Sequence, residues 1–278
     1  MTPRALIRAA ADEFRAAGVP DPEVDASVLL SHLCGRPPLV LRLDDEILLP
    51  EETAVRYREL CERRLRREPL QYILREAPFC GFTFYVDSRV LIPRPETELL
   101  CEWAAALLSG REHPAVLDLC CGSGCLGIAL KRLVPSAAVW GADISSAALA
   151  VSRMNASRLN ADVRLVQSDL FTSLPDQAFD LIVSNPPYIP SSVCEDLQPE
   201  VTQEPALALD GGADGLSFYR RICAAAPDRL RPGGVLLMEL GDGQAPDVKK
   251  LMQSAGFAAV EIREDYRSVP RMIAGTYV

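Results

Sequence analysis

The chain has 278 residues, of which 49% are hydrophobic and 24% charged, and its formal net charge is −9 at pH 7. These proportions are typical of globular proteins, and no apolar run approaches the roughly 20 residues that a membrane span needs. The acidic balance disfavours an enzyme that grips duplex DNA through a basic face. No signal-peptide core follows the first residues, so we expect a cytoplasmic protein with nine reduced cysteines and no metal site.

Residues 1–75 are predicted to form a small all-α domain. A helix over 5–17 is stopped by Gly18-Val19-Pro20, and a second helix starts at Asp21-Pro22. A third helix starts after Pro50, with acids in its first turn and arginines in its last, which suits the helix dipole.

Residues 76–92 differ in character from the helical part. The stretch 79–86 is aromatic and β-branched with a glycine in the middle, which predicts a β-hairpin that links two domains. The run Pro-Arg-Pro-Glu-Thr-Glu at 93–98 then opens a helix.

Residues 93–278 show strands alternating with helices. Short apolar runs predict strands at 115–120, 137–142, 163–167, 179–184 and 235–240, and two last strands near 259–262 and 272–277. Between them lie helical stretches, among them 145–159, 215–230 and 245–255. This alternation predicts an α/β domain with a mainly parallel sheet covered on both faces.

The first predicted strand runs into a glycine turn. In such sheets ligands bind at the carboxyl ends of the strands, and glycines let a ligand approach the backbone and the free N–H groups of the next helix. We therefore expect the turn to hold a nucleotide-like cofactor through Cys120, Cys121, Gly122, Ser123 and Gly124. Alone, this signal also fits a plain turn between a strand and a helix.

Two acidic residues stand at the ends of the next two strands, where they could bind an adenosine-containing cofactor. Asp143 ends the second strand, where a carboxylate can accept from both ribose hydroxyls. Asp169 ends the third strand, where it can accept from an adenine amino group beside the backbone N–H of Leu170. A single acid at a strand end often only caps the following helix. The glycine turn, Asp143 and Asp169 occur in the expected order, however, and together they favour a cofactor site. The same sites fit a dehydrogenase, because Gly127 supplies the third glycine of its pattern.

The segment Asn185-Pro186-Pro187-Tyr188 follows the fourth strand and carries the most chemistry. Its two prolines remove two N–H donors and hold Asn185 extended, which leaves the Asn185 side-chain oxygen and the Pro186 carbonyl as acceptors for a substrate –NH2 group. Tyr188 offers a flat face to a planar group. Acceptors that grip both hydrogens orient the nitrogen, and their dipoles stabilise the positive charge that methylation builds on it.

A dehydrogenase, which transfers hydride, needs no such segment. A turn that is merely rigid could have the same sequence. We predict an enzyme that uses S-adenosyl-L-methionine to methylate a planar amide or amine nitrogen. Asn185, Pro186 and Tyr188 are the expected catalytic residues. With Pro187 they form the expected substrate site, and Asn185 is expected to border the cofactor as well.

In order along the chain, these motifs resemble the bacterial peptide chain release factor glutamine methyltransferases. The resemblance covers nearly the whole chain and rests on runs at 69–72, 91–98, 116–124, 185–190, 204–209 and 212–215. It implies a Rossmann-like class I methyltransferase domain with a seven-stranded sheet, a small all-α N-terminal domain and a β-hairpin linker. It also implies methylation of the glutamine in the Gly-Gly-Gln motif of class 1 release factors. Cys120 departs from the family, which usually has glycine there.

The resemblance makes class 1 peptide chain release factors the expected partners, without a membrane or direct nucleic-acid contact, and we expect a monomer. The arginine-rich run 56–67 is either a solvated helix face paired with Glu59, Glu62 and Glu68, or a surface that docks the release factor. The alternative function is methylation of an exocyclic amino group of DNA or RNA. It would require a basic groove near Asn185, yet residues 1–75 are almost neutral and the negative charge lies in the remainder.

Overall fold

A computed structural model describes residues 1–278 and divides into two compact units, each with its own hydrophobic core. The helical unit contains residues 1–75 and the short segment 198–203. The sheet unit contains residues 76–197 and 204–278. None of the helices is both long and apolar enough to cross a membrane.

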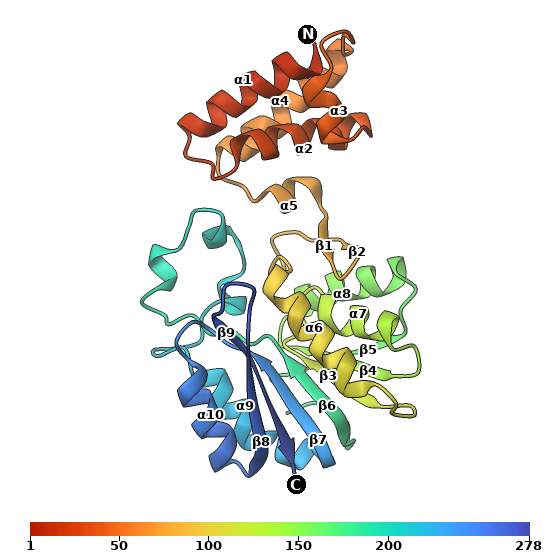
Figure 1. Cartoon of the computed structure of the whole chain (residues 1–278), viewed down its shortest axis with the longest axis vertical. Helices are drawn as coiled ribbons and strands as arrows, with labels where there is room; N and C mark the ends of the chain where they lie inside the picture. The colour runs from red at the N-terminus through yellow and green to blue at the C-terminus, as the bar shows by residue number, and fades with distance from the viewer. The chain divides into compact units, whose positions relative to one another are not determined.

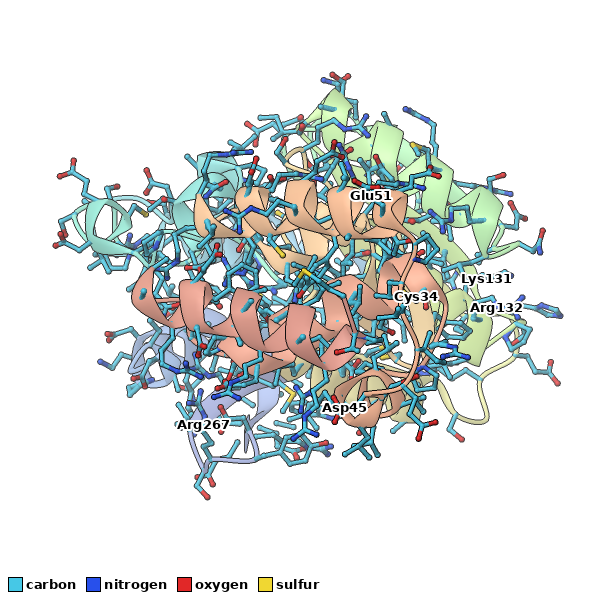
Figure 2. The ribbon with its side chains drawn as sticks, turned by 90° about the horizontal axis from the view of Figure 1, so that it is seen from above. Cys34, Asp45, Glu51, Lys131, Arg132 and Arg267 are labelled. Atoms are coloured by element: carbon cyan, nitrogen blue, oxygen red, sulfur yellow. The ribbon has the colours of Figure 1, made fainter.

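The helical unit packs its helices around fully buried side chains that include Phe14, Leu29 and Leu30. Thr2 caps the first helix and Gly35, at φ +63°, ends the second. Glu51, labelled in Figure 2, opens the longest of the five helices. The helices are α1 (Pro3–Ala16), α2 (Pro22–Cys34), α3 (Pro38–Leu43), α4 (Glu51–Leu65) and α5 (Leu70–Leu74). The short helices α3 and α5 are not expected from the sequence pattern.

The segment 198–203 joins the helical unit through an ion-pair cluster. Glu200 accepts hydrogen bonds from Arg64 at 2.8 Å and from Arg67 at 2.7 Å. Arg64 is 4% exposed and also donates to Asp25 at 2.7 Å. Sequence pattern did not anticipate this segment, because its partners are more than 130 positions away in the chain.

The sheet unit is built on a seven-stranded sheet in the order β5-β4-β3-β6-β7-β9-β8. Strands β3 to β7 are parallel, and β9 runs antiparallel to both of its neighbours. The strands are β3 (Ala115–Leu119), β4 (Ala138–Asp143), β5 (Val163–Gln167), β6 (Phe179–Ser184), β7 (Leu230–Glu239), β8 (Phe257–Glu264) and β9 (Pro270–Tyr277). The α/β fold and the parallel sheet predicted from the sequence are confirmed.

Helices cover both faces of this sheet (Figure 1). One face carries α6 (Pro95–Leu108), α7 (Cys125–Leu133) and α8 (Ser146–Arg158), and the other carries α9 (Ser217–Ala225) and α10 (Ala245–Ser254). Lys131, labelled in Figure 2, donates to the carbonyls of Pro135 and Ala137 and so ties the end of α7 to the next strand. The expected helix over 215–230 is too long, because Pro227 interrupts it and Leu230 already belongs to β7.

A short hairpin of β1 (Ala77–Phe79) and β2 (Phe82–Phe84) precedes α6. Its turn has Cys80 and Gly81 at positive φ, and Phe79 and Phe84 meet edge to face at 6.0 Å between ring centroids. The chain between β6 and α9 contains three single-turn 3-10 helices, Cys194–Asp196, Val201–Gln203 and Ala206–Ala208. A fourth, Pro227–Arg229, precedes β7.

Candidate active site

Two adjoining cavities lie at the carboxyl ends of β3, β4 and β6. The main cleft has about 880 Å³ of empty space, its open mouth included, which suits a ligand of nucleoside size. Seven of the predicted site residues line it: Cys120, Gly122, Asp143, Asp169, Leu170, Asn185 and Pro187. A smaller pocket is lined by Cys120, Cys121, Gly122, Ser123 and Asn185 together with Thr97 and Asp118. Gly124, Pro186 and Tyr188 line neither cavity.

The glycine turn is held in shape by the acid at the end of β4. Asp143 accepts the N–H of Gly122 and the N–H of Ser145, both at 2.8 Å. Burial raises the pKa of this carboxyl, and the backbone N–H groups act against that rise. Each of its oxygens has a second lone pair, so Asp143 can anchor the turn and still accept from a ligand in the main cleft.

Cys120 adopts a backbone conformation that favours glycine. Its φ is +62°, followed by Gly122 at +53° and Gly124 at +77°. A side chain in this left-handed region costs about 1–2 kcal/mol. This conformation explains why the family usually has glycine where this chain has Cys120. Cys120 lines both cavities, and burial raises the pKa of its thiol beyond the usual range.

Polar side chains of α8 support the same turn from behind. Ser152 donates to the carbonyl of Gly122 at 2.7 Å, and Asn155 donates to the carbonyl of Ser123 at 2.9 Å. Both supporting side chains are fully buried. A Cβ on Gly124 would lie 3.2 Å from Ser152 and 2.9 Å from Ile128, so glycine is required for this close packing.

The far wall of the main cleft is apolar, with an ion pair at its edge. Leu170, Phe218 and Ala208 provide apolar surface. Asp169 pairs with Arg221 at 2.7 Å, and both side chains are nearly half exposed. The predicted adenine contact of Asp169 therefore involves a carboxylate that already has a cationic partner in this structure.

The side chain of Asn185 is oriented by a buried hydrogen-bond chain. Its Nδ2 donates to Thr97 Oγ1 at 3.2 Å, and the Thr97 hydroxyl donates to Glu239 at 2.6 Å. Thr97 and Glu239 are 3% and 2% exposed. With Nδ2 committed to Thr97, the Oδ1 atom of Asn185 is the one left to accept from a ligand.

The backbone around Tyr188 is braced by Gln244 and by glycines. Gln244 donates to the Tyr188 carbonyl at 2.9 Å and accepts from the N–H of Gly241 at 3.0 Å. A Cβ on Gly215 would lie 2.4 Å from the Tyr188 oxygen, and one on Gly211 would lie 2.7 Å from its Cα. The Tyr188 hydroxyl donates to Glu239 at 3.3 Å, which places it toward the buried carboxylate.

Glu204 connects two runs that are far apart in the sequence. Its side chain is buried, accepts the N–H of Ile92 at 2.9 Å and pairs with Arg94. The next residues, Pro205, Leu207 and Ala208, then line the main cleft. The run at 204–209 thus forms one wall of the cleft, held in place by the run at 91–98.

Sequence reasoning missed three buried polar residues: Thr97, Asp118 and Glu239. Thr97 lies in the run at 93–98, which supports the family resemblance but does not indicate what the threonine does. Glu239 ends an apolar strand, as many capping acids do, so no local pattern shows its contacts. Asp118 lies inside an apolar strand, and its burial and its bond from the N–H of Gly127 at 2.8 Å are tertiary features.

The sheet order separates two classes of nucleotide-binding protein. Dinucleotide-binding dehydrogenases have a parallel sheet in the order 3-2-1-4-5-6. Here the antiparallel β9 is inserted between β7 and β8, which gives 3-2-1-4-5-7-6. This topology, with the oriented Asn185 beside the cleft, defines a class I S-adenosylmethionine-dependent methyltransferase.

Comparisons with known proteins specify the family. Residues 5–74 match the family model "PrmC N-terminal domain", and residues 97–204 match "Methyltransferase small domain". The "Release factor glutamine methyltransferase" of Geobacter sulfurreducens is 46% identical over 260 residues, 93% of this chain and 90% of that protein. Its counterpart in Chlorobaculum tepidum is 43% identical over 265 residues, 91% of this chain and 90% of that protein. This chain belongs to the release factor glutamine methyltransferase family.

Solved structures support the fold. The hMettl16 catalytic domain superposes with a TM-score of 0.59 at 16% identity, covering 82% of this chain and 81% of that chain. A methyltransferase from Pyrococcus furiosus superposes with a TM-score of 0.53 at 17% identity, covering 70% of this chain and 89% of that chain. At these identities the likeness concerns the fold alone.

Proposed function

We propose that this protein transfers a methyl group from S-adenosyl-L-methionine to the side-chain amide nitrogen of the glutamine in the Gly-Gly-Gln motif of class 1 peptide chain release factors. The observation that carries the proposal is the oriented Asn185 amide, whose Nδ2 is bound to Thr97 and whose Oδ1 is left for a substrate N–H. The names of the family's members supply the substrate class.

The main cleft fits the proposed cofactor. A Cβ on Gly122 would meet nothing within 4 Å, so the backbone there is open to a ligand. Asp143 and Asp169 provide acceptors, and Leu170 and Phe218 provide apolar surface for a flat ring. Asn185 borders the same cleft, Cys121 and Ser123 line the adjoining smaller pocket, and Gly124 allows the close packing of the turn against Ser152. When bound, the cofactor supplies an electrophilic methyl group.

The protein's own contribution is to orient a poor nucleophile. An amide lone pair is delocalised, so the nitrogen reacts only when its plane and lone pair are correctly placed. Asn185 Oδ1 and the Pro186 carbonyl would each accept one N–H of the glutamine amide. Tyr188 would pack near the amide plane, and Pro187 would shape the wall. These acceptor dipoles stabilise the positive charge that develops on nitrogen, and its proton can leave to water afterwards.

The test is transfer from isotopically labelled cofactor to a purified class 1 release factor, followed by mass spectrometry of its peptides. We expect one added methyl group on the Gly-Gly-Gln glutamine and no transfer to a release factor in which that glutamine is replaced. An Asn185→Ala variant that binds the cofactor normally should lose most activity. Cofactor binding without transfer by the parent enzyme would reject the proposal.

Transfer to DNA or RNA is the alternative outcome of the same assay. Nucleic acids should be supplied in parallel under the same conditions. Label in nucleic acid, with none in the release factor, would establish the exocyclic amino-group activity instead.

We also propose that residues 1–75 form a domain that helps to dock the release factor, that residues 76–92 act as its linker, and that the enzyme works as a cytoplasmic monomer. The arginine run 56–67 is largely engaged within the helical unit. Arg58 pairs with Glu13 at 2.7 Å, and Arg63 pairs with Glu68. These pairs, and the buried pairs of Arg64, favour a structural role within the helical unit for most of the run.

Arg56 and Arg66 take no part in these pairs, so their charge can be reversed without breaking them. If the run docks an acidic surface, the Arg56→Glu and Arg66→Glu double variant should bind the release factor more weakly. Unchanged affinity would remove the run from the docking surface. Light scattering of the purified protein measures its mass in solution and so tests whether it is a monomer.

A further inference from the structure

The hydrogen-bond chain behind Asn185 ends on a carboxylate that the proposed reaction does not use. Glu239 closes β7, and each of its oxygens accepts one hydroxyl proton: Thr97 at 2.6 Å and Tyr188 at 3.3 Å. Its backbone carbonyl accepts from the Tyr219 hydroxyl at 2.9 Å. Of the residues that carry these hydroxyls, Thr97 lines the smaller pocket together with Asn185, and Tyr188 belongs to the proposed substrate segment 185–188.

We propose that Glu239 is a positioning residue, which acts through Thr97 to keep the Asn185 amide with its oxygen toward the substrate nitrogen. The inference rests on the proposed function. It assigns no contact between Glu239 and the substrate, because Glu239 is 2% exposed and lines neither cavity.

The polarity of the chain follows from the ionisation of Glu239. An ionised carboxylate has no proton and can only accept, so the Thr97 hydroxyl must point its hydrogen at Glu239. The oxygen of Thr97 then offers only lone pairs to Asn185, which must present its Nδ2. The amide oxygen is consequently directed away from Thr97, where it can accept the N–H of a substrate amide.

Protonation of Glu239 would reverse this order. The carboxyl would donate its proton to Thr97 or to Tyr188. If Thr97 receives it, the Thr97 hydroxyl turns its own hydrogen toward Asn185, which favours Oδ1 on that side. The Asn185 –NH2 group would then face the substrate –NH2 group, and two donors would oppose each other.

The surroundings of Glu239 make this protonation accessible near neutral pH. Burial raises the pKa of Glu239 to about 7, the charge of Glu96 acts in the same direction, and the bonds from Thr97 and Tyr188 and the charge of Arg271 act against it. Methyl transfer should therefore be slow below this pKa and reach its plateau above it.

The experiment measures single-turnover methylation of the release factor by the parent enzyme and by Thr97→Val, Thr97→Ser and Glu239→Gln, over about pH 6 to pH 8. Valine keeps the shape of threonine without the hydroxyl, whereas serine keeps the hydroxyl. We expect Thr97→Val to lower the rate of transfer about tenfold, and Thr97→Ser to stay within about threefold of the parent. The cofactor Kd should be unchanged in both.

Glu239→Gln supplies the second readout, because an amide does not titrate. The parent rate should rise with pH through the pKa of Glu239, and this rise should be absent in the variant. A parent-like rate in Thr97→Val, or an unchanged pH rise in Glu239→Gln, would overturn the inference while leaving the proposed function intact. A parent enzyme that binds cofactor and methylates no release factor would reject both.

Discussion

Asp118 provides a quantitative test of how burial affects this fold. Its carboxylate lies under the glycine turn, 2% exposed, and accepts one bond, from the N–H of Gly127. Burial raises the pKa of Asp118 from 3.8 to about 7, and the charge of Asp143 adds to the rise. The difference between those two values corresponds to about 4 kcal/mol, at 1.36 kcal/mol per pKa unit.

The sign of the pH dependence follows from linkage. Between about pH 4 and pH 7 the unfolded chain ionises Asp118 while the folded chain keeps it protonated, so folding stability falls as pH rises through this window. Above pH 7 both states are ionised and the folded state retains the full cost. Asp118→Asn removes the charge and keeps an oxygen that can accept from Gly127. We expect Asp118→Asn to raise the free energy of unfolding by about 2 kcal/mol at pH 5 and by about 4 kcal/mol at pH 8.

Urea unfolding followed by tryptophan fluorescence suits this measurement, because both tryptophans, Trp103 and Trp140, belong to the sheet unit. The parent will also lose stability with rising pH through Glu239, so the difference between variant and parent isolates Asp118. Asp228→Asn removes a carboxylate from the exposed surface and serves as the control. An equal difference between Asp118→Asn and parent at both pH values would refute the reasoning.

Three further substitutions test other contacts. Gly215→Ala would put a Cβ 2.4 Å from the Tyr188 carbonyl at φ +74°, so we expect a loss of about 3 kcal/mol in urea unfolding and slower methyl transfer. Cys120→Gly relieves a φ of +62°, so cofactor affinity by calorimetry should be retained, and a large loss would show that the thiol contacts the cofactor. Arg64→Ala leaves the buried Asp25 without its cation, whereas Glu200 keeps Arg67, so we expect a cost of about 3 kcal/mol, detected as faster hydrogen exchange in α2 and α4.

The sheet could be predicted from the sequence because its central strands are buried on both faces. Such strands are continuous apolar runs that end at turn residues or acids. The predicted strands at 163–167 and 179–184 coincide with β5 and β6. The boundary near residue 230 failed because Pro227 breaks the helix locally, while the start of β7 depends on pairing with β6.

The site could be predicted only in part, for a different reason. A glycine turn and strand-end acids are local patterns, so their place at one edge of a parallel sheet follows from topology. The chain from Glu239 through Thr97 to Asn185 joins residues 142 and 88 positions apart. Short helices such as α3 follow prolines and span only six residues, too few for a hydrophobic period to show.

The motifs that carried the family resemblance are spread over some 120 residues of the sheet unit, yet they form one structure around the segment 185–188. Thr97, from the run at 91–98, fixes the side chain of Asn185. Glu204 holds the same run by accepting the N–H of Ile92. Gly215, from the run at 212–215, leaves the space that the Tyr188 carbonyl occupies. Each contact needs its partner in place, so the proposed amide-orienting site requires all four runs together, whereas Asn-Pro-Pro-Tyr alone could serve other planar nitrogens.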